Sequence, residues 1–155
     1  MKNIQWFPGH MAKTRRAISA NLKLVDAVVE IVDARAPLSS RNPEMDRLTA
    51  GKPRIILLNK CDLADEKVTQ KWVSYFGNMG ITALAVDCKS GKGLKSFIPA
   101  VKTKTLKELM EKRQKNGMSN APVRLMIVGI PNVGKSSLIN KLAGAKRTKV
   151  EDRPG

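Results

Sequence analysis

Hydrophobic positions along the chain form two alternating patterns. Short apolar runs, several of them rich in β-branched residues, predict buried strands at 27–33, 54–60, 81–87 and 123–129. Between these runs, apolar residues recur every three or four positions, which predicts helices within 11–25, 65–76, 93–117 and 135–144. This alternation predicts an α/β fold, in which helices flank a mostly parallel sheet.

Three details refine this prediction. Val68, Trp72 and Phe76 share one helical face, and we expect that face to pack on the core. Pro99 falls inside a helical pattern, so the helix is expected to kink or restart there. Residues 116–122 (NGMSNAP) are typical of turns and predict a linker.

A glycine-rich loop lies between the fourth predicted strand and a helix. Its sequence GIPNVGKS fits the pattern G-x-x-x-x-G-K-[ST] of phosphate-binding loops. The glycines would let backbone N–H groups approach phosphates, while the helix N-terminus adds partial positive charge. Lys135 would reach the β- and γ-phosphates, and the Ser136 hydroxyl would ligate Mg²⁺. The nucleotide-binding residues expected here are Asn132, Val133, Gly134, Lys135, Ser136 and Ser137.

The second predicted strand ends in the sequence Asn59-Lys60-Cys61-Asp62. The Asp62 carboxylate could accept hydrogen bonds from N1–H and the exocyclic amino group of guanine, a donor pair that adenine lacks. Asn59 and the stem of Lys60 would brace the base and the loop. Turns are rich in these residue types, but the position at a strand end, in a chain with a phosphate loop, favours recognition of guanine.

A third loop, DCKSGKG (87–93), follows the third predicted strand. It stands where guanine-nucleotide proteins often carry Ser-Ala-Lys, whose backbone amides contact the guanine oxygen. Cys88 and Lys89 are therefore further candidates for nucleotide binding, although an ordinary turn between a strand and a helix is the alternative.

Charge adds a second class of partner. The chain has 29 Lys and Arg against 13 Asp and Glu, a formal net charge of +16, which favours polyanions. Aromatic residues make up only 4%, so contact with a phosphate backbone is favoured over base stacking, and no DNA specificity is expected. A solvated basic surface is the alternative. No run reaches the roughly 18 apolar residues of a membrane span, and no secretory signal is evident, which predicts a cytoplasmic protein without a membrane partner.

The order of these motifs resembles that of the circularly permuted GTPases, in which the base-recognition motif precedes the phosphate loop. The strings WFPGHM (6–11) and VDARAPLSSRNP (32–43) are similar to those of the bacterial ribosome-biogenesis GTPase A family, which acts late in large-subunit assembly. The resemblance extends from about Gln5 to Gly155. It implies a circularly permuted, Ras-like P-loop fold, with a basic segment (1–25), a base-recognition half (26–115), the linker and a phosphate-loop half (123–155).

The resemblance also implies an activity and partners. The expected protein is a monomeric GTPase that uses GTP, GDP and Mg²⁺ and binds the large-subunit precursor and its rRNA through basic segments such as 1–16 and 101–117. Beside Lys135, His10 is a catalytic candidate that could orient the attacking water, or else a turn histidine that packs on Trp6 or contacts rRNA. Asn132 matches an asparagine of potassium-stimulated GTPases, so K⁺ is a possible cofactor. For Asp33 and Arg35, a structural salt bridge and a functional role both stay open.

In that family a switch threonine, an Asp-x-x-Gly motif and a C-terminal helical RNA-binding region follow, and none of them lies within residues 1–155. We therefore expect an incomplete sheet that is exposed beside the phosphate-loop strand, weak nucleotide affinity and little turnover from the chain as written. The alternative function is a non-catalytic rRNA-binding remnant with a vestigial guanine-nucleotide site. An ATP-using kinase is disfavoured by the Asn59–Asp62 motif.

Overall fold

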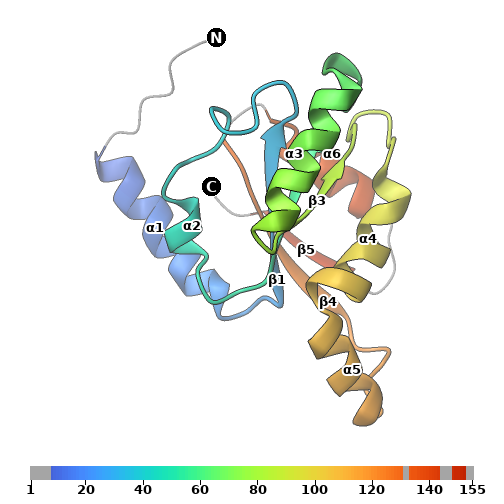
Figure 1. The fold of residues 1–155 in the computed structure, drawn as a ribbon. Helices are drawn as coiled ribbons and strands as arrows, with labels where there is room; N and C mark the ends of the chain where they lie inside the picture. Colours follow the sequence, from blue (N-terminus) through green and yellow to red (C-terminus); the bar gives the residue numbers. More distant parts are fainter. Residues whose placement is uncertain (1–7, 131–132, 144–147, 153–155) are drawn as a thin grey trace.

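The computed structural model describes the backbone of residues 8–130, 133–143 and 148–152, and the side chains of 15–130 and 133–143. At its centre lies a five-stranded parallel sheet in the order β3-β2-β1-β4-β5 (Figure 1). The strands are β1 (Ala27–Asp33), β2 (Arg54–Asn59), β3 (Thr82–Ala85), β4 (Val123–Val128) and β5 (Thr148–Asp152). The predicted parallel α/β architecture is confirmed, and four strands lie where the apolar runs predicted them.

Helices cover both faces of the sheet (Figure 1). Against one face pack α4 (Phe97–Ala100), α5 (Lys107–Lys115) and α6 (Lys135–Leu142). Against the other face lie α1 (Pro8–Leu22), α2 (Met45–Leu48) and α3 (Glu66–Asn78). Burial on both faces explains why β1 reads as a continuous apolar run rather than an alternating one.

Three expectations about these elements need correction. The phosphate-loop strand β4 is not at the edge, because β5 pairs with it in parallel from Val123–Thr148 to Ile127–Asp152. Val68 does not face the core: its side chain is 49% exposed, and Thr69 is buried on the inner face with Phe76. The restart expected at Pro99 comes two residues earlier: α4 begins at Phe97 after a 3₁₀ turn (Leu94–Ser96), and Pro99 lies in its first turn, where proline is tolerated.

The helical pattern at 93–117 is instead interrupted further along. A short π-helical segment spans Val101–Thr105, with Leu106 N–H bonded to the carbonyl oxygen of Val101 at 2.7 Å, and α5 begins at Lys107. Residues 116–122 form turns between α5 and β4.

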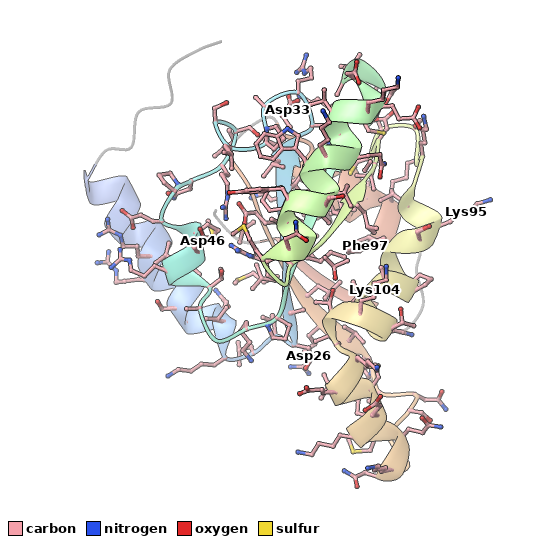
Figure 2. All side chains as sticks on the ribbon, viewed as in Figure 1. Asp26, Asp33, Asp46, Lys95, Phe97 and Lys104 are labelled. Carbon is pink, nitrogen blue, oxygen red and sulfur yellow. The ribbon has the colours of Figure 1, made fainter. Side chains whose placement is uncertain are left out.

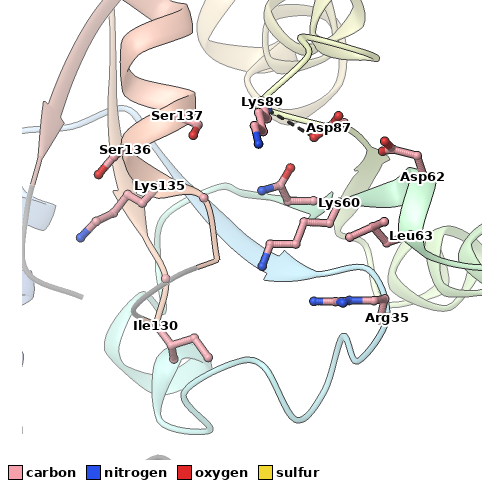
Figure 3. A pocket seen from close by; sticks show the side chains of 13 residues that line it. Arg35, Lys60, Asp62, Leu63, Asp87, Lys89, Ile130, Lys135, Ser136 and Ser137 are labelled. Carbon is pink, nitrogen blue, oxygen red and sulfur yellow. Dashed lines mark hydrogen bonds between the residues drawn. The ribbon is translucent and has the colours of Figure 1, made fainter. Parts of the chain in front are cut away.

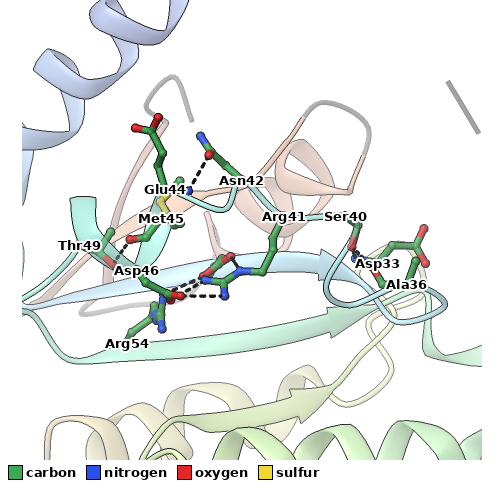
Figure 4. Close-up of polar contacts among 11 residues, drawn as sticks. Asp33, Ala36, Ser40, Arg41, Asn42, Glu44, Met45, Asp46, Thr49 and Arg54 are labelled. Atoms are coloured by element: carbon green, nitrogen blue, oxygen red, sulfur yellow. Dashed lines mark hydrogen bonds and ion pairs between the residues drawn. The ribbon is translucent and has the colours of Figure 1, made fainter. Parts of the chain in front are cut away.

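A buried ion cluster fastens the segment after β1 to the sheet (Figure 4). The Glu30 carboxylate, 2% exposed, accepts two bonds from Arg41 at 2.7 Å and one from Arg54 at 3.2 Å. Both arginines also pair with Asp46. A buried charge of this kind is tolerated only when it is paired and hydrogen-bonded. The cluster therefore fixes the course of the chain between the end of β1 and the start of β2.

Within the described parts of the chain, none of the helices combines the length and apolar character that a bilayer-spanning helix needs.

Candidate nucleotide-binding site

A pocket of about 850 Å³ lies at the carboxyl edge of the sheet, where open parallel sheets place their ligand sites. Figure 3 shows Asp62, Asp87 and Lys89 toward one end, Lys135 and Ser136 toward the other, and Lys60 between them. The residues lining it are Arg35, Asn59, Lys60, Asp62, Leu63, Asp87, Lys89, Gly129, Ile130, Gly134, Lys135, Ser136 and Ser137.

The side-chain amide of Asn59 joins three loops beneath this pocket. Its Nδ2 donates to the carbonyl oxygen of Val133 at 2.6 Å, and its Oδ1 accepts from the backbone N–H of Cys88 at 2.8 Å. The side chain is buried, so both of its polar groups are satisfied by protein. One residue at the end of β2 thus connects its own loop to the loop after β3 and to the phosphate loop after β4.

The loop after β2 has an unusual backbone that directs its side chains. Lys60 adopts the left-handed conformation (φ 62°), at a cost of roughly 1–2 kcal/mol for a residue with a Cβ. A 3₁₀ turn, Cys61–Leu63, follows, and the Cys61 N–H donates to the carbonyl oxygen of Val86 at 3.1 Å. This reversal leaves Asp62 and Leu63 exposed at the pocket.

At the other end of the pocket, glycine permits close backbone packing. Gly134 has φ 110° and precedes the first turn of α6; a Cβ at this position would overlap Nδ2 of Asn59. A Cβ on Gly129 would lie 2.8 Å from Cγ2 of Val133 and 3.1 Å from the carbonyl oxygen of Ile31. The two glycines of the motif are thus required by packing, and they bring the backbone of the loop and the N-terminus of α6 to the pocket wall.

Charged groups gather at the end of β1. Asp33 accepts hydrogen bonds from Arg35 and lies 3.6 Å from Nζ of Lys60. The hydrogen bond from the Arg35 side chain holds the pKa of Asp33 below its usual value. At the loop after β3, the Ser90 side chain likewise lowers the pKa of Asp87. Both carboxylates are therefore ionised at neutral pH.

Neither Cys61 nor Cys88, in the loops beside the end of the pocket that holds Asp62 (the base end), has the surroundings of a reactive nucleophile. Burial raises the pKa of the Cys61 thiol and raises that of Cys88 to about 12. Cys88 is fully buried, so its predicted contribution to the site is through its backbone N–H, which already bonds to Asn59.

The structure brings most of the predicted site residues together. Eight of them line the pocket: Asn59, Lys60, Asp62, Lys89, Gly134, Lys135, Ser136 and Ser137. Cys61, Cys88 and Val133 support these loops from outside the lining. Asn132 lies outside the described residues, and so does the side chain of His10, so both stay predictions. The pocket also includes Arg35, Leu63 and Asp87, which the sequence did not assign to it; the only signal was their position at strand ends beside the recognised motifs.

Comparisons with known proteins agree with this geometry. A family model described as "50S ribosome-binding GTPase" matches residues 124–155, which contain the phosphate loop and α6. The ribosome biogenesis GTPase A of Priestia megaterium is 53% identical over 152 residues, covering 98% of this chain and 53% of that protein. The chain is a homologue of bacterial ribosome biogenesis GTPase A. The predicted resemblance to these proteins and the predicted P-loop GTPase fold are confirmed.

Two further matches are less similar in sequence than the Priestia megaterium protein. The mitochondrial ribosome-associated GTPase 1 of Bos taurus is 39% identical over 159 residues, covering 97% of this chain and 46% of its own length. The GNP-bound structure of YlqF from T. maritima superposes with a TM-score of 0.60 at 35% identity, covering 92% of this chain and 57% of that one. The chain spans about half the length of the ribosome biogenesis GTPase A proteins that it matches.

Proposed function

We propose that the chain binds GTP and GDP with Mg²⁺ in this pocket and hydrolyses GTP as part of a factor that assembles the large ribosomal subunit. The observation that carries the proposal is the Asn59 amide, which joins a guanine-recognition loop to a phosphate loop. The volume of the pocket lies in the usual range for small-molecule sites. The names of the relatives, ribosome biogenesis GTPase A among them, support the same function.

Guanine would be recognised at the end of the pocket that holds Asp62. Its carboxylate, exposed and directed by the 3₁₀ turn, is suited to accept from N1–H and the exocyclic amino group. The stem of Lys60 would lie against the purine, and Lys89 would contact it from the loop after β3. Leu63 adds apolar surface for the base at the same end.

The phosphates would lie over the loop between Gly129 and Lys135. The absence of a Cβ at Gly134 leaves room for backbone N–H groups to approach oxygen atoms, and α6 presents its N-terminus there. Lys135 would neutralise charge on the β- and γ-phosphates, and the Ser136 hydroxyl at the pocket wall would hold Mg²⁺. When bound, Mg²⁺ neutralises charge that develops on the phosphate oxygens. His10 would orient the attacking water, and Asn132 would support a K⁺ ion.

The ribosomal partner is inferred from charge. Exposed lysines occur along the helical segment before the linker: Lys104, Lys107, Lys112 and Lys115. Their field favours contact with an rRNA backbone of the large-subunit precursor. Such a factor would act in the cytoplasm as a monomer. Its affinity for the particle would have to differ between GTP and GDP states, because only a difference in binding energy makes a switch.

Fluorescence titration with mant-GDP and mant-GTP tests the nucleotide site. Unlabelled GDP is expected to displace the probe, and ATP is not. Phosphate release is then measured with Mg²⁺, with and without large ribosomal subunits and K⁺. Loss of both binding and turnover in Lys135→Ala would support the proposal, because that substitution removes the cation nearest the phosphates. Equal competition by ATP would overturn guanine specificity.

The same experiment separates the alternative function. A non-catalytic rRNA-binding remnant would bind rRNA with a steep salt dependence and release no phosphate, even when ribosomal subunits are present. Turnover stimulated by the subunits would exclude it.

A further inference from the structure

The carboxylate of Asp33 contacts two of the cations that line the pocket, Arg35 and Lys60. Its Oδ1 accepts from Nε and the backbone N–H of Arg35 at 3.0 and 2.9 Å, and its Oδ2 accepts from Nη2 at 2.7 Å. The same Oδ2 lies 3.6 Å from Nζ of Lys60. The Asp33 side chain is only 14% exposed, so water screens these contacts less than at an open surface.

The two cations lie in the loops after two neighbouring strands, β1 and β2, and meet at one place. Asp33 is the last residue of β1, and its register partner in β2 is Asn59, the residue before Lys60. Arg35 follows Asp33 by two positions, and both Arg35 and Lys60 project toward the pocket (Figure 3). The carboxylate thus sits behind the wall that the two side chains form.

The position of Asp33 is itself fixed by the chain that follows it. Its backbone N–H donates to Oγ of Ser40 at 2.8 Å, and Ser40 Oγ donates to the carbonyl oxygen of Ala36 (Figure 4). Next to Ser40, Arg41 enters the buried ion cluster with Glu30. A carboxylate held this firmly can hold its two partners in turn, which reduces the conformational freedom that long side chains lose when they bind a ligand.

Of the two cations, Lys60 has the more flexible side chain, so the ion pair with Asp33 restricts it most. Its left-handed backbone sets the direction in which the side chain leaves the loop, but a flexible four-carbon stem separates Cα from the ammonium group. An ion pair at the far end keeps the aliphatic stem extended across the pocket. Arg35, held by a bidentate pair, presents a rigid planar group beside it.

We propose that Asp33 is a positioning residue for the nucleotide, which holds Lys60 and Arg35 along one wall so that the Lys60 stem and the Arg35 guanidinium flank the guanosine. This inference rests on the proposed function. It assigns Arg35 to direct nucleotide contact and Asp33 to an indirect role through the two cations. Because the wall lies at the base end, it acts equally on GDP and GTP.

The central test compares Asp33→Asn with Asp26→Asn in the purified protein with Mg²⁺. Asp26 is a matched control: it accepts from the backbone N–H of Arg124 at 2.8 Å and from Arg113 at 3.3 Å, and it lies at the opposite end of β1 (Figure 2). Asp33→Asn is expected to weaken mant-GDP and a non-hydrolysable GTP analogue by the same factor, about tenfold, because one charge-assisted contact network is lost. Asp26→Asn is expected to lower the melting temperature without changing either affinity.

A double-mutant cycle identifies the route through Lys60. Lys60→Met keeps an apolar stem but removes one of the two cations that contact Asp33, so adding Asp33→Asn to it should weaken binding less than the same change does in the wild type. Arg35→Gln, at a half-exposed side chain that does not threaten folding, should weaken both nucleotides by about threefold on its own.

Every outcome of these measurements either supports or overturns the positioning role of Asp33. Wild-type affinity in Asp33→Asn and Arg35→Gln, equal losses in Asp33→Asn and Asp26→Asn, or full additivity with Lys60→Met would overturn the positioning role. If Asp33→Asn does not fold, wild-type affinity in Arg35→Gln is sufficient to overturn it. Failure of the unmodified protein to bind mant-GDP would instead overturn the proposed function.

Discussion

The two ends of the pocket are built by different means. At the base end, side chains supply the chemistry: the carboxylates of Asp62 and Asp87 and the cations of Arg35 and Lys60. At the phosphate end, the backbone supplies much of the chemistry. Positions 129 and 134 require glycine because a Cβ there would overlap neighbouring atoms. Side-chain recognition can be altered by a single exchange of functional groups, whereas a backbone cradle fails as soon as its shape changes.

Asn59 makes the two ends depend on each other. It belongs to the base-recognition motif, yet its amide bonds to Val133 in the phosphate loop, and a Cβ on Gly134 would meet that same amide. Substitutions that distort the phosphate end are therefore expected to disturb the base end as well. Substitutions at the exposed tip of the base end should affect only that end.

The largest effect is expected from Gly134→Ala. The substitution combines a positive φ with a direct overlap on Asn59, so the loop must move, and mant-GDP affinity should fall by at least about 100-fold. Gly77→Ala is the control, because Gly77 lies within α3 and a methyl group added there would meet no other atom within 4 Å; it should leave affinity unchanged and raise stability slightly. Near-normal binding by Gly134→Ala would show that the loop is not a close-packed cradle.

Asn59→Ala should come next. It leaves the N–H of Cys88 and the carbonyl oxygen of Val133 without their buried partner, which is expected to lower the free energy of unfolding by about 2–4 kcal/mol. GDP and GTP affinities should both fall by about 10- to 100-fold. Asn42→Ala, at another buried amide that accepts from Glu44 N–H away from the pocket, should destabilise the fold without this loss. Chemical denaturation and mant-nucleotide titration give the two quantities.

A double-mutant cycle of Gly134→Ala and Asn59→Ala tests directly whether the two ends of the pocket depend on each other. If the overlap with Asn59 is what excludes a side chain at Gly134, the combined variant should lose less affinity than the sum of the single changes. If the two losses of affinity simply add, the base end and the phosphate end are independent of each other.

Asp62→Asn is expected to change specificity rather than abolish binding. An amide at this exposed tip no longer accepts both guanine donors, so GDP should weaken by about 10- to 100-fold while xanthosine diphosphate becomes the preferred ligand. The ratio of GTP to GDP affinity should not change, because the phosphate end is untouched. Asp65→Asn, three residues along at the start of α3, should leave base preference intact. Retained guanine preference in Asp62→Asn would refute the assignment of the base end.

The last prediction concerns the reactivity of the two thiols beside the base end and expects no change in nucleotide affinity. Burial raises the pKa of Cys61 and brings that of Cys88 to about 12, so both stay protonated at pH 8, and iodoacetamide should modify Cys61 first. Cys88 should react at least about 100-fold more slowly in the folded protein, and faster in Asn59→Ala, where its loop loses its partner. Mass spectrometry over time measures both rates; equal rates in the folded protein would contradict the burial of Cys88.

Several features of this protein follow from local sequence alone. Apolar runs with buried faces specify β1, β2 and β4, and the phosphate loop is recognised because its glycines, lysine and serine keep a fixed spacing between a strand and a helix. The prediction that Asp62 contacts the base rests on the same kind of local pattern, and the structure places this residue in the pocket lining. These properties depend on neighbours a few residues apart, which is the range over which sequence patterns carry information.

Other features exist only once distant segments meet. Nothing in its own motif indicates that Asn59 bonds to a residue 74 positions away, that Glu30 is buried between arginines from two different segments, or that Asp33 holds Lys60. Periodicity alone predicts the wrong face for Val68, because a 3.6-residue repeat leaves the buried stripe uncertain by one position, and the packing of Thr69 and Phe76 decides it. The sequence determined which chemical groups are present; the parallel register of the sheet decided which of them lie within hydrogen-bonding distance.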